Sequence, residues 1–246
     1  MAWLSRFQAL VRSLRPEHAP SQTPANYRDL PAWYLEGRKR LESMFPPLPR
    51  PKAGDAETRS PSGRYFLHIN GAPGGLTRGV VRRTSDRKVV ADIMRNHYQF
   101  VYAWVSQGES EYFVTSEDYQ CQTVVALPTR DKYVFVPKEA ERGGGYCWRT
   151  MLPSEDGRLL LVECCIWACP FEYHLYDFSR PSLGPRLLVN ISATLHPEWY
   201  DQDHEEDAVW IDNRRIRLTC GSMEPAVWDV DKLVSLASRA KQSTGA

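Results

Sequence analysis

The sequence has no long apolar run and almost no net charge, and each absence narrows the possible functions. No stretch approaches the roughly eighteen unbroken apolar residues that a membrane-spanning helix needs, so we expect a soluble protein. The 31 basic and 30 acidic residues leave a net charge of +1, which removes the global charge argument for nucleic-acid binding. Residues 1–15 carry spread arginines in place of the apolar run of a secretory signal. We therefore expect a cytoplasmic protein, with organelle targeting by residues 1–15 left open.

Familiar catalytic motifs are also missing. Neither Gly-x-Ser-x-Gly, which exposes a nucleophilic serine, nor His-Glu-x-x-His, which binds catalytic zinc, occurs in the chain. The glycines at 143–145 precede a predicted strand, whereas a phosphate-binding loop needs Gly-Lys-Ser/Thr at the start of a helix. These absences favour a non-enzymatic protein without a cofactor.

The six cysteines indicate buried thiols more than disulfides, because we expect a reducing compartment. Cys164, Cys165 and Cys169, with His174 nearby, form a candidate metal group. Zinc takes four Cys or His donors, usually in closely spaced pairs, and a second pair is missing. Adjacent residues of a strand also point to opposite faces. We therefore expect structural cysteines, with a metal site or a reactive Cys169 as alternatives.

A recurring pattern of apolar triplets dominates what the sequence does contain. Triplets at 65–67, 112–114 and 159–161 are centred on 66, 113 and 160, two steps of 47 residues, and a looser copy lies at 215–217. Turn-forming residues precede each of the first three triplets. Ser60-Pro61-Ser62-Gly63, before the triplet at 65–67, is an example. A repeat of this length built from short strands is typical of a β-propeller or a similar array of sheets.

Further strands surround each triplet. Leading strands are expected at 99–105, 146–151 and 208–211, second strands at 80–81, 123–125, 173–176 and 226–228, and third strands at 88–90, 132–135 and 186–189. The first unit then lacks a leading strand and the fourth lacks a last one. A closed ring must pair its terminal edges, either with strands from both chain ends in one sheet or with a partner chain.

The order of these elements resembles the blades of WD-repeat and related β-propellers. The resemblance rests on the order of a strand, a Ser-Pro-Ser-Gly turn, a second strand and then an aromatic residue followed by aspartate. This last pair occurs at Tyr176-Asp177 and at Trp228-Asp229. A stretch in uncharacterised microbial and fungal proteins is similar to two segments of this chain. These are residues 164–173, which contain Cys-x-Trp-Ala-Cys-Pro, and residues 176–179. This resemblance covers roughly residues 100–190, implies a propeller-like fold and implies no activity. Unlike WD repeats, no unit opens with Gly-His.

The N-terminal third has a different character. Apolar residues at helical spacing and three arginines predict a basic amphipathic helix over 2–15, which either docks on the protein or a partner, or tethers the chain to a membrane surface. A second helix is expected over 31–45, capped by Asp29. The Pro-rich segment 46–60 is predicted to be a linker, with a PxxP ligand as the alternative.

An acidic loop at 196–207 is the second candidate for metal chemistry. Asp201, Asp203 and Glu205 alternate as the first ligands of a calcium loop do, but the glycine and glutamate that complete such a loop are missing. The simpler interpretation is a solvated loop neutralised by the arginines at 214–217. The alternative is a metal-dependent hydrolase that uses Asp201, Asp203, His204 and His196.

Taken together, the sequence predicts a mainly β protein with a propeller-like array of about four antiparallel sheets. It divides into a helical segment 1–45, the linker 46–60 and a sheet domain 61–246 that closes with a short helix at 231–241. We expect a scaffold that binds a protein partner rather than nucleic acid, in an oligomeric state that the sequence leaves open. The proposed contact residues are Trp167, Phe171, Trp199 and Tyr200, because aromatic side chains dominate interfaces. Core packing is the competing interpretation for all four.

Overall fold

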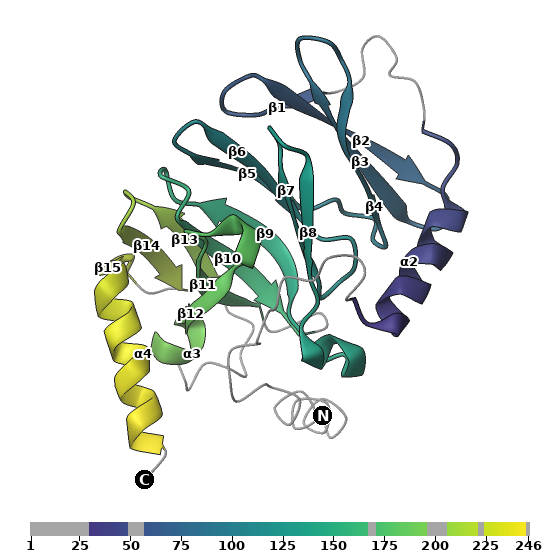
Figure 1. Cartoon of the computed structure of the whole chain (residues 1–246). Helices are drawn as coiled ribbons and strands as arrows, with labels where there is room; N and C mark the ends of the chain where they lie inside the picture. The colour runs from purple at the N-terminus through teal and green to yellow at the C-terminus, as the bar shows by residue number, and fades with distance from the viewer. Residues whose placement is uncertain (1–29, 49–56, 167–170, 196–205, 221–223, 245–246) are drawn as a thin grey trace. The chain divides into compact units, whose positions relative to one another are not determined.

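The computed structural model describes residues 30–48, 57–166, 171–195, 206–220 and 224–244. These residues form four antiparallel sheets and few helices (Figure 1). Described residues within 23–136 and 182–184 form one compact unit, called the N-terminal unit. Those within 137–181 and 185–246 form the other, called the C-terminal unit. The described helices are all too short or too polar to cross a bilayer.

The N-terminal unit contains helix α2 (Ala32–Met44) and two four-stranded sheets. The first sheet consists of β1 (Glu57–Arg59), β2 (Tyr65–Ala72), β3 (Leu76–Arg83) and β4 (Val89–Arg95). The second consists of β5 (Tyr102–Gln107), β6 (Ser110–Thr115), β7 (Gln122–Ala126) and β8 (Asp131–Phe135). In both sheets the strands lie in chain order, so each sheet is a simple meander.

The C-terminal unit contains the other two sheets and most of the remaining helices. Its four-stranded sheet consists of β9 (Cys147–Pro153), β10 (Leu159–Cys165), β11 (Glu172–Asp177) and β12 (Arg186–Asn190). The last sheet has, in the described part of the chain, three strands: β13 (Glu206–Trp210), β14 (Arg215–Cys220) and β15 (Ala226–Asp229). Helices α3 (Ile191–Leu195) and α4 (Val230–Thr244) follow β12 and β15. Short 3-10 turns are η2 (Lys138–Arg142) and η3 (Pro181–Leu183).

The four triplets fall on the second strand of the four sheets, namely β2, β6, β10 and β14. The second strand of a meander has a neighbour on each side. Where such a strand is buried on both faces, it has a continuous apolar run rather than alternation, whereas in β14 Ile216 is buried between the exposed Arg215 and Arg217. The triplet of β10 shows the continuous run clearly, because Leu160 and Leu161 are fully buried although they point to opposite faces.

The structure corrects the expectation that the first sheet lacks a leading strand. Strand β1 occupies this place and pairs with β2, with Thr58 opposite Leu67. The segment 46–60 therefore ends in a strand, and residues 49–56 lie outside the described part. Strand β1 has only three residues, of which Thr58 and Arg59 are exposed. An edge strand of this length carries no apolar pattern, so it cannot be recognised from the sequence.

The helices differ from their expected bounds by a few residues. Helix α2 begins after Pro31, whose carbonyl accepts the first backbone hydrogen bonds from Tyr34 and Leu35, and no side chain caps it. The expected cap, Asp29, and the expected helix 2–15 lie outside the described residues. Helix α4 is longer than the predicted 231–241. Asp229 caps it by accepting hydrogen bonds from the backbone N–H groups of Asp231 (2.8 Å) and Lys232 (3.2 Å).

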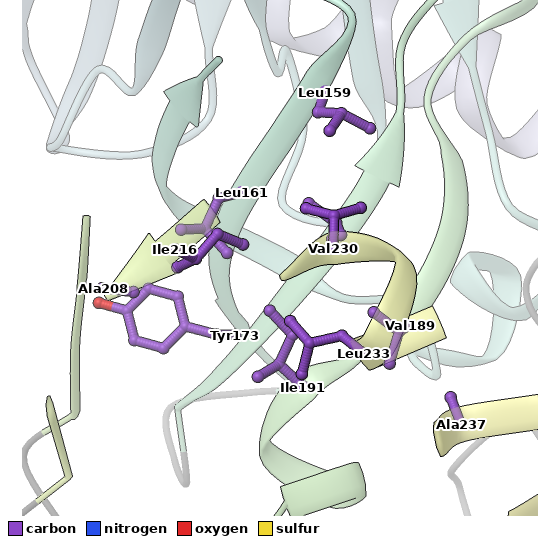
Figure 2. Packing of buried hydrophobic residues seen from close by; sticks show 11 residues of the cluster. Leu159, Leu161, Tyr173, Val189, Ile191, Ala208, Ile216, Val230, Leu233 and Ala237 are labelled. Carbon is purple, nitrogen blue, oxygen red and sulfur yellow. The ribbon is translucent and has the colours of Figure 1, made fainter. Parts of the chain in front are cut away.

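The C-terminal unit has one apolar core between its sheets and α4 (Figure 2). Leu161, Leu175 and Val189 come from the four-stranded sheet, and Ile216 comes from β14. Leu233 of α4 is fully buried against them. The indole N–H of Trp210 donates to the carbonyl of Leu152 at 2.8 Å, which links β13 to β9. The last sheet and α4 are thus held to the four-stranded sheet by one continuous core.

Candidate functional site

The most exposed aromatic side chain among the described residues is Tyr98, in the loop between β4 and β5. It is 75% exposed. Its ring lies 4.2 Å from that of His97, centroid to centroid, and the edge of Tyr119 meets His97 at 5.3 Å. We call His97, Tyr98 and Tyr119 the aromatic patch. The patch lies wholly in the N-terminal unit.

The loop that carries Tyr98 is tied to its surroundings by Arg95. This side chain is only 3% exposed. Its Nε donates to the carbonyl of Gln99 at 2.8 Å, and one Nη donates to the carbonyl of Ser116 at 2.8 Å and also contacts the Ser116 hydroxyl. A buried guanidinium that satisfies several carbonyls at once holds the two loops in one arrangement.

Two further hydrogen bonds hold the same loop. The hydroxyl of Thr77, on β3, donates to the carbonyl of His97 at 2.7 Å. The backbone N–H of Asn96 donates to the carbonyl of Glu117 at 3.2 Å. The loop is therefore fixed to β3 on one side and to the β6–β7 connection on the other. Tyr98 projects from a backbone that is already ordered.

His97 is neutral at pH 7 in this setting. Burial lowers its pKa, and the nearby positive charge of Arg95 acts in the same direction, while a hydrogen bond to the carbonyl of Gln99 opposes them. When Nδ1 of His97 carries no proton it accepts the backbone N–H of Gln99 at 3.0 Å, whereas a protonated Nδ1 faces the Gln99 carbonyl at 3.3 Å. The patch thus presents neutral aromatic rings rather than a cation.

The predicted cysteine and histidine group lies inside the protein, on one face of the β9–β12 sheet. Cys164 lies opposite Glu172 on the neighbouring strand, and His174 follows two positions later. Cys164 and His174 are fully buried, and Glu172 is 3% exposed. Cys165 is buried too, whereas Cys169 lies outside the described residues. Burial of Cys164 and Cys165 agrees with a structural role for them.

The polar atoms of this group already satisfy one another. The Nε2 atom of His174 lies 3.0 Å from Oε2 of Glu172, and its Nδ1 atom lies 3.3 Å from the hydroxyl of Tyr176. Asn190 donates to the same Glu172 oxygen at 2.5 Å. Burial raises the pKa of Cys164 well above its ordinary value, and the charge of Glu172 adds to this effect. The Cys164 thiol is therefore protonated and a poor nucleophile.

Metal binding finds no support in the described part of the chain, where no three His, Cys, Asp or Glu side chains are grouped to hold an ion. The acidic loop lies outside these residues, so its candidate ligands are not placed: His196, Asp201, Asp203, His204 and Glu205. Two of the arginines expected to neutralise that loop have partners elsewhere. Arg214 contacts Asp231 at 2.5 Å, and Arg215 contacts Asp212 at 2.7 Å.

Of the four predicted contact residues, Phe171 alone is described, and Trp167, Trp199 and Tyr200 lie outside the described residues. Phe171 is 40% exposed. The guanidinium of Arg149 lies 4.7 Å from the centre of its ring and donates to Glu163 at 2.9 Å. Phe171 is thus a partly exposed aromatic stacked under a cation, not a core residue.

Sequence reasoning missed the aromatic patch. The segment Asn96-His97-Tyr98-Gln99 was available as a signal, because it places two aromatic rings between two predicted strands. The sequence pattern predicts a leading strand that begins at residue 99, whereas β5 begins at Tyr102. The loop is therefore longer than the pattern predicts.

No family model matches the chain. "Uncharacterized protein R762" of Acanthamoeba polyphaga mimivirus is 29% identical to it over 136 residues, which are 53% of this chain and 53% of that protein. The chain therefore spans about half the length of this curated relative.

Solved structures that are partly similar to the chain include the following two. The Dos1 propeller has a TM-score of 0.43 at 10% identity and is matched over 71% of this chain and 41% of that chain. A structure from a study of two prolyl endopeptidases has a TM-score of 0.48 at 12% identity, over 72% of this chain and 27% of that chain.

Proposed function

We propose that this chain is a non-enzymatic scaffold that binds a protein partner in the cytoplasm, and that its four sheets form a small propeller-like array. The observation that carries the proposal is Tyr98, which is 75% exposed on a loop that Arg95 and Thr77 hold in place. Rigid frames that present ordered loops are well suited to recognition.

The physical argument concerns the cost of binding. A tyrosine offers a large contact area and a hydroxyl with few rotatable bonds. When its loop is ordered beforehand, association loses less conformational entropy. Removing such a central aromatic from an interface typically costs about 2 kcal/mol or more, which corresponds to roughly a thirtyfold weaker dissociation constant. His97 and Tyr119 would form the rim against which the partner packs.

Phe171 extends the proposal to the C-terminal unit as a second contact residue. Its exposed face and the cation of Arg149 above the ring suit a partner with an aromatic or acidic side chain. Trp167, Trp199 and Tyr200 remain proposed contact residues on the same reasoning from sequence. With a net charge of +1, the chain gives no general attraction to nucleic acid.

Site-specific photo-crosslinking tests the proposal in cells that naturally make the protein. A benzophenone amino acid is placed at position 98 of the full chain. In a matched control it is placed at Met44, which is 51% exposed in the same unit. We expect a discrete cross-linked polypeptide from position 98 that position 44 does not give. Identical cross-linking patterns from the two positions would argue against a binding surface at Tyr98.

A further inference from the structure

Two cysteines of the C-terminal unit lie directly opposite each other on neighbouring strands. Cys147 begins β9, Cys165 ends β10, and the two are register partners. Both are thiols in this structure. Directly opposite residues of an antiparallel pair point to the same face, with Cα atoms about 4.5–5.5 Å apart and Cβ atoms about 4.5–5.5 Å apart.

These spacings suit a disulfide after a small adjustment. A disulfide joins residues whose Cα atoms are about 4.4–6.8 Å apart and whose Cβ atoms are about 3.5–4.5 Å apart. The adjustment is available here, because the register of β9 against β10 shifts between Glu163 and Cys164, next to the pair. Among the described residues, β9 is also an edge strand of its sheet.

The pair differs from the nearby Cys164 in its access to solvent. Cys147 is partly exposed, whereas Cys164 is fully buried and faces Trp148 and Glu172 across the sheet. Cys165 is 5% exposed and lies directly opposite Cys147 on the neighbouring strand. A small oxidant therefore reaches Cys147 first, and Cys165 is placed to complete the reaction.

We propose that Cys147 and Cys165 form a reversible disulfide when the protein meets a low-molecular-weight disulfide such as glutathione disulfide. The Cys147 thiolate attacks one sulfur of the oxidant, releases one glutathione and forms a mixed disulfide. The Cys165 thiolate then attacks the sulfur of Cys147 and displaces the second glutathione. The protein loses two electrons and two protons, and one glutathione disulfide becomes two glutathiones.

Such a bond would join the two ends of the β9–β10 hairpin. A cross-link of this kind limits the conformations of the unfolded chain and so favours the folded state. The oxidised protein should therefore melt several degrees higher than the reduced protein. Excess dithiothreitol should reverse both the bond and the shift.

The test uses the full-length protein equilibrated in buffers of increasing glutathione disulfide to glutathione ratio. The samples are quenched in acid and alkylated, and the modified cysteines are located by peptide mass spectrometry. We expect two of the six cysteines to become protected, with the peptides of Cys147 and Cys165 joined. Cys147→Ser, at a partly exposed position, should abolish protection of Cys165, whereas Cys169→Ser should leave the bond intact.

Three results would overturn the proposal. The first is equal alkylation of all six cysteines at every ratio. The second is a bond that joins Cys165 to Cys169 or to another cysteine. The third is a glutathione adduct that persists on Cys147 without protection of Cys165. Circular dichroism of each variant shows whether it is folded, so a folding failure is not read as loss of the bond.

Discussion

The hydroxyl of Tyr34 donates to the carboxylate of Glu117 at 3.1 Å, although the two residues lie 83 positions apart in the sequence. Arg38, one turn further along α2, contacts the same oxygen at 2.9 Å. The ammonium group of Lys132 contacts the other oxygen of Glu117. Glu117 is fully buried, so this carboxylate anchors α2 to the second sheet of the N-terminal unit.

Replacing Glu117 by Gln should destabilise the N-terminal unit. The change removes one charge and leaves Arg38, itself 8% exposed, with less compensation for its burial. Removing one partner of a buried ion pair typically costs about 3 kcal/mol or more, and we expect about 2–4 kcal/mol because Lys132 is partly solvated. Urea denaturation followed by fluorescence measures the loss.

The matched control for this change is Glu42→Gln. Glu42 pairs with the same Arg38 at 2.9 Å, but its side chain is 52% exposed. An exposed pair of this kind contributes under about 0.5 kcal/mol. Equal losses in Glu117→Gln and Glu42→Gln would show that the buried carboxylate does not anchor α2.

A second prediction concerns the glycine at position 79 of β3. A Cβ atom at Gly79 would lie 2.1 Å from the ring of Phe100, whereas a Cβ atom at Gly71 of β2 meets nothing within 4 Å. Phe100 is 8% exposed and packs in the core of the N-terminal unit, so its ring cannot move into solvent freely. Overpacking of this kind costs about 1–3 kcal/mol.

Thermal unfolding of Gly79→Ala and Gly71→Ala compares the two positions. Neither glycine has a positive φ angle, so the backbone tolerates alanine at both. We expect a clear fall in melting temperature for Gly79→Ala and little change for Gly71→Ala. Similar melting temperatures for the two variants would contradict close packing of Phe100 on the β3 backbone.

A third prediction follows from the charge of Asp177 at the end of β11. Burial opposes ionisation of this carboxyl, but hydrogen bonds from Ser179 and Arg186 outweigh burial and lower its pKa. A group whose folded pKa is lowered stabilises the fold above its unfolded pKa of about 4. That contribution is lost as the pH falls through the folded pKa.

Urea denaturation of the wild type and of Asp177→Asn at several pH values tests this sign. We expect the wild type to be more stable at pH 7, by under about 1 kcal/mol because Arg186 is exposed. The difference should shrink as the pH falls below 4. A difference that grows toward low pH would show that the folded pKa of Asp177 is raised, not lowered.

Local patterns in the sequence predicted most of the strands, and long-range contacts explain what they missed. The triplet at 159–161 was recognisable because its residues are buried on both faces of β10. Strand β1 gave no signal, because its three polar residues lie at an edge. The contact of Glu117 with α2 also could not be predicted from the sequence, because a single glutamate after a strand forms no periodic pattern. The order of the Tyr98 loop likewise depends on a non-local hydrogen bond, from Arg95 to Ser116, that the sequence pattern does not reveal.

The affinity of the cross-linked partner for the protein tests the central claim most directly. The partner is purified, and its dissociation constant is measured by calorimetry for the wild type, for Tyr98→Ala and for Val227→Ala. Val227 is 56% exposed and serves as the surface control. We predict that Tyr98→Ala binds at least about tenfold more weakly, with an unchanged melting temperature, and that Val227→Ala binds as the wild type does. A dissociation constant for Tyr98→Ala within twofold of the wild-type value would contradict the proposed function.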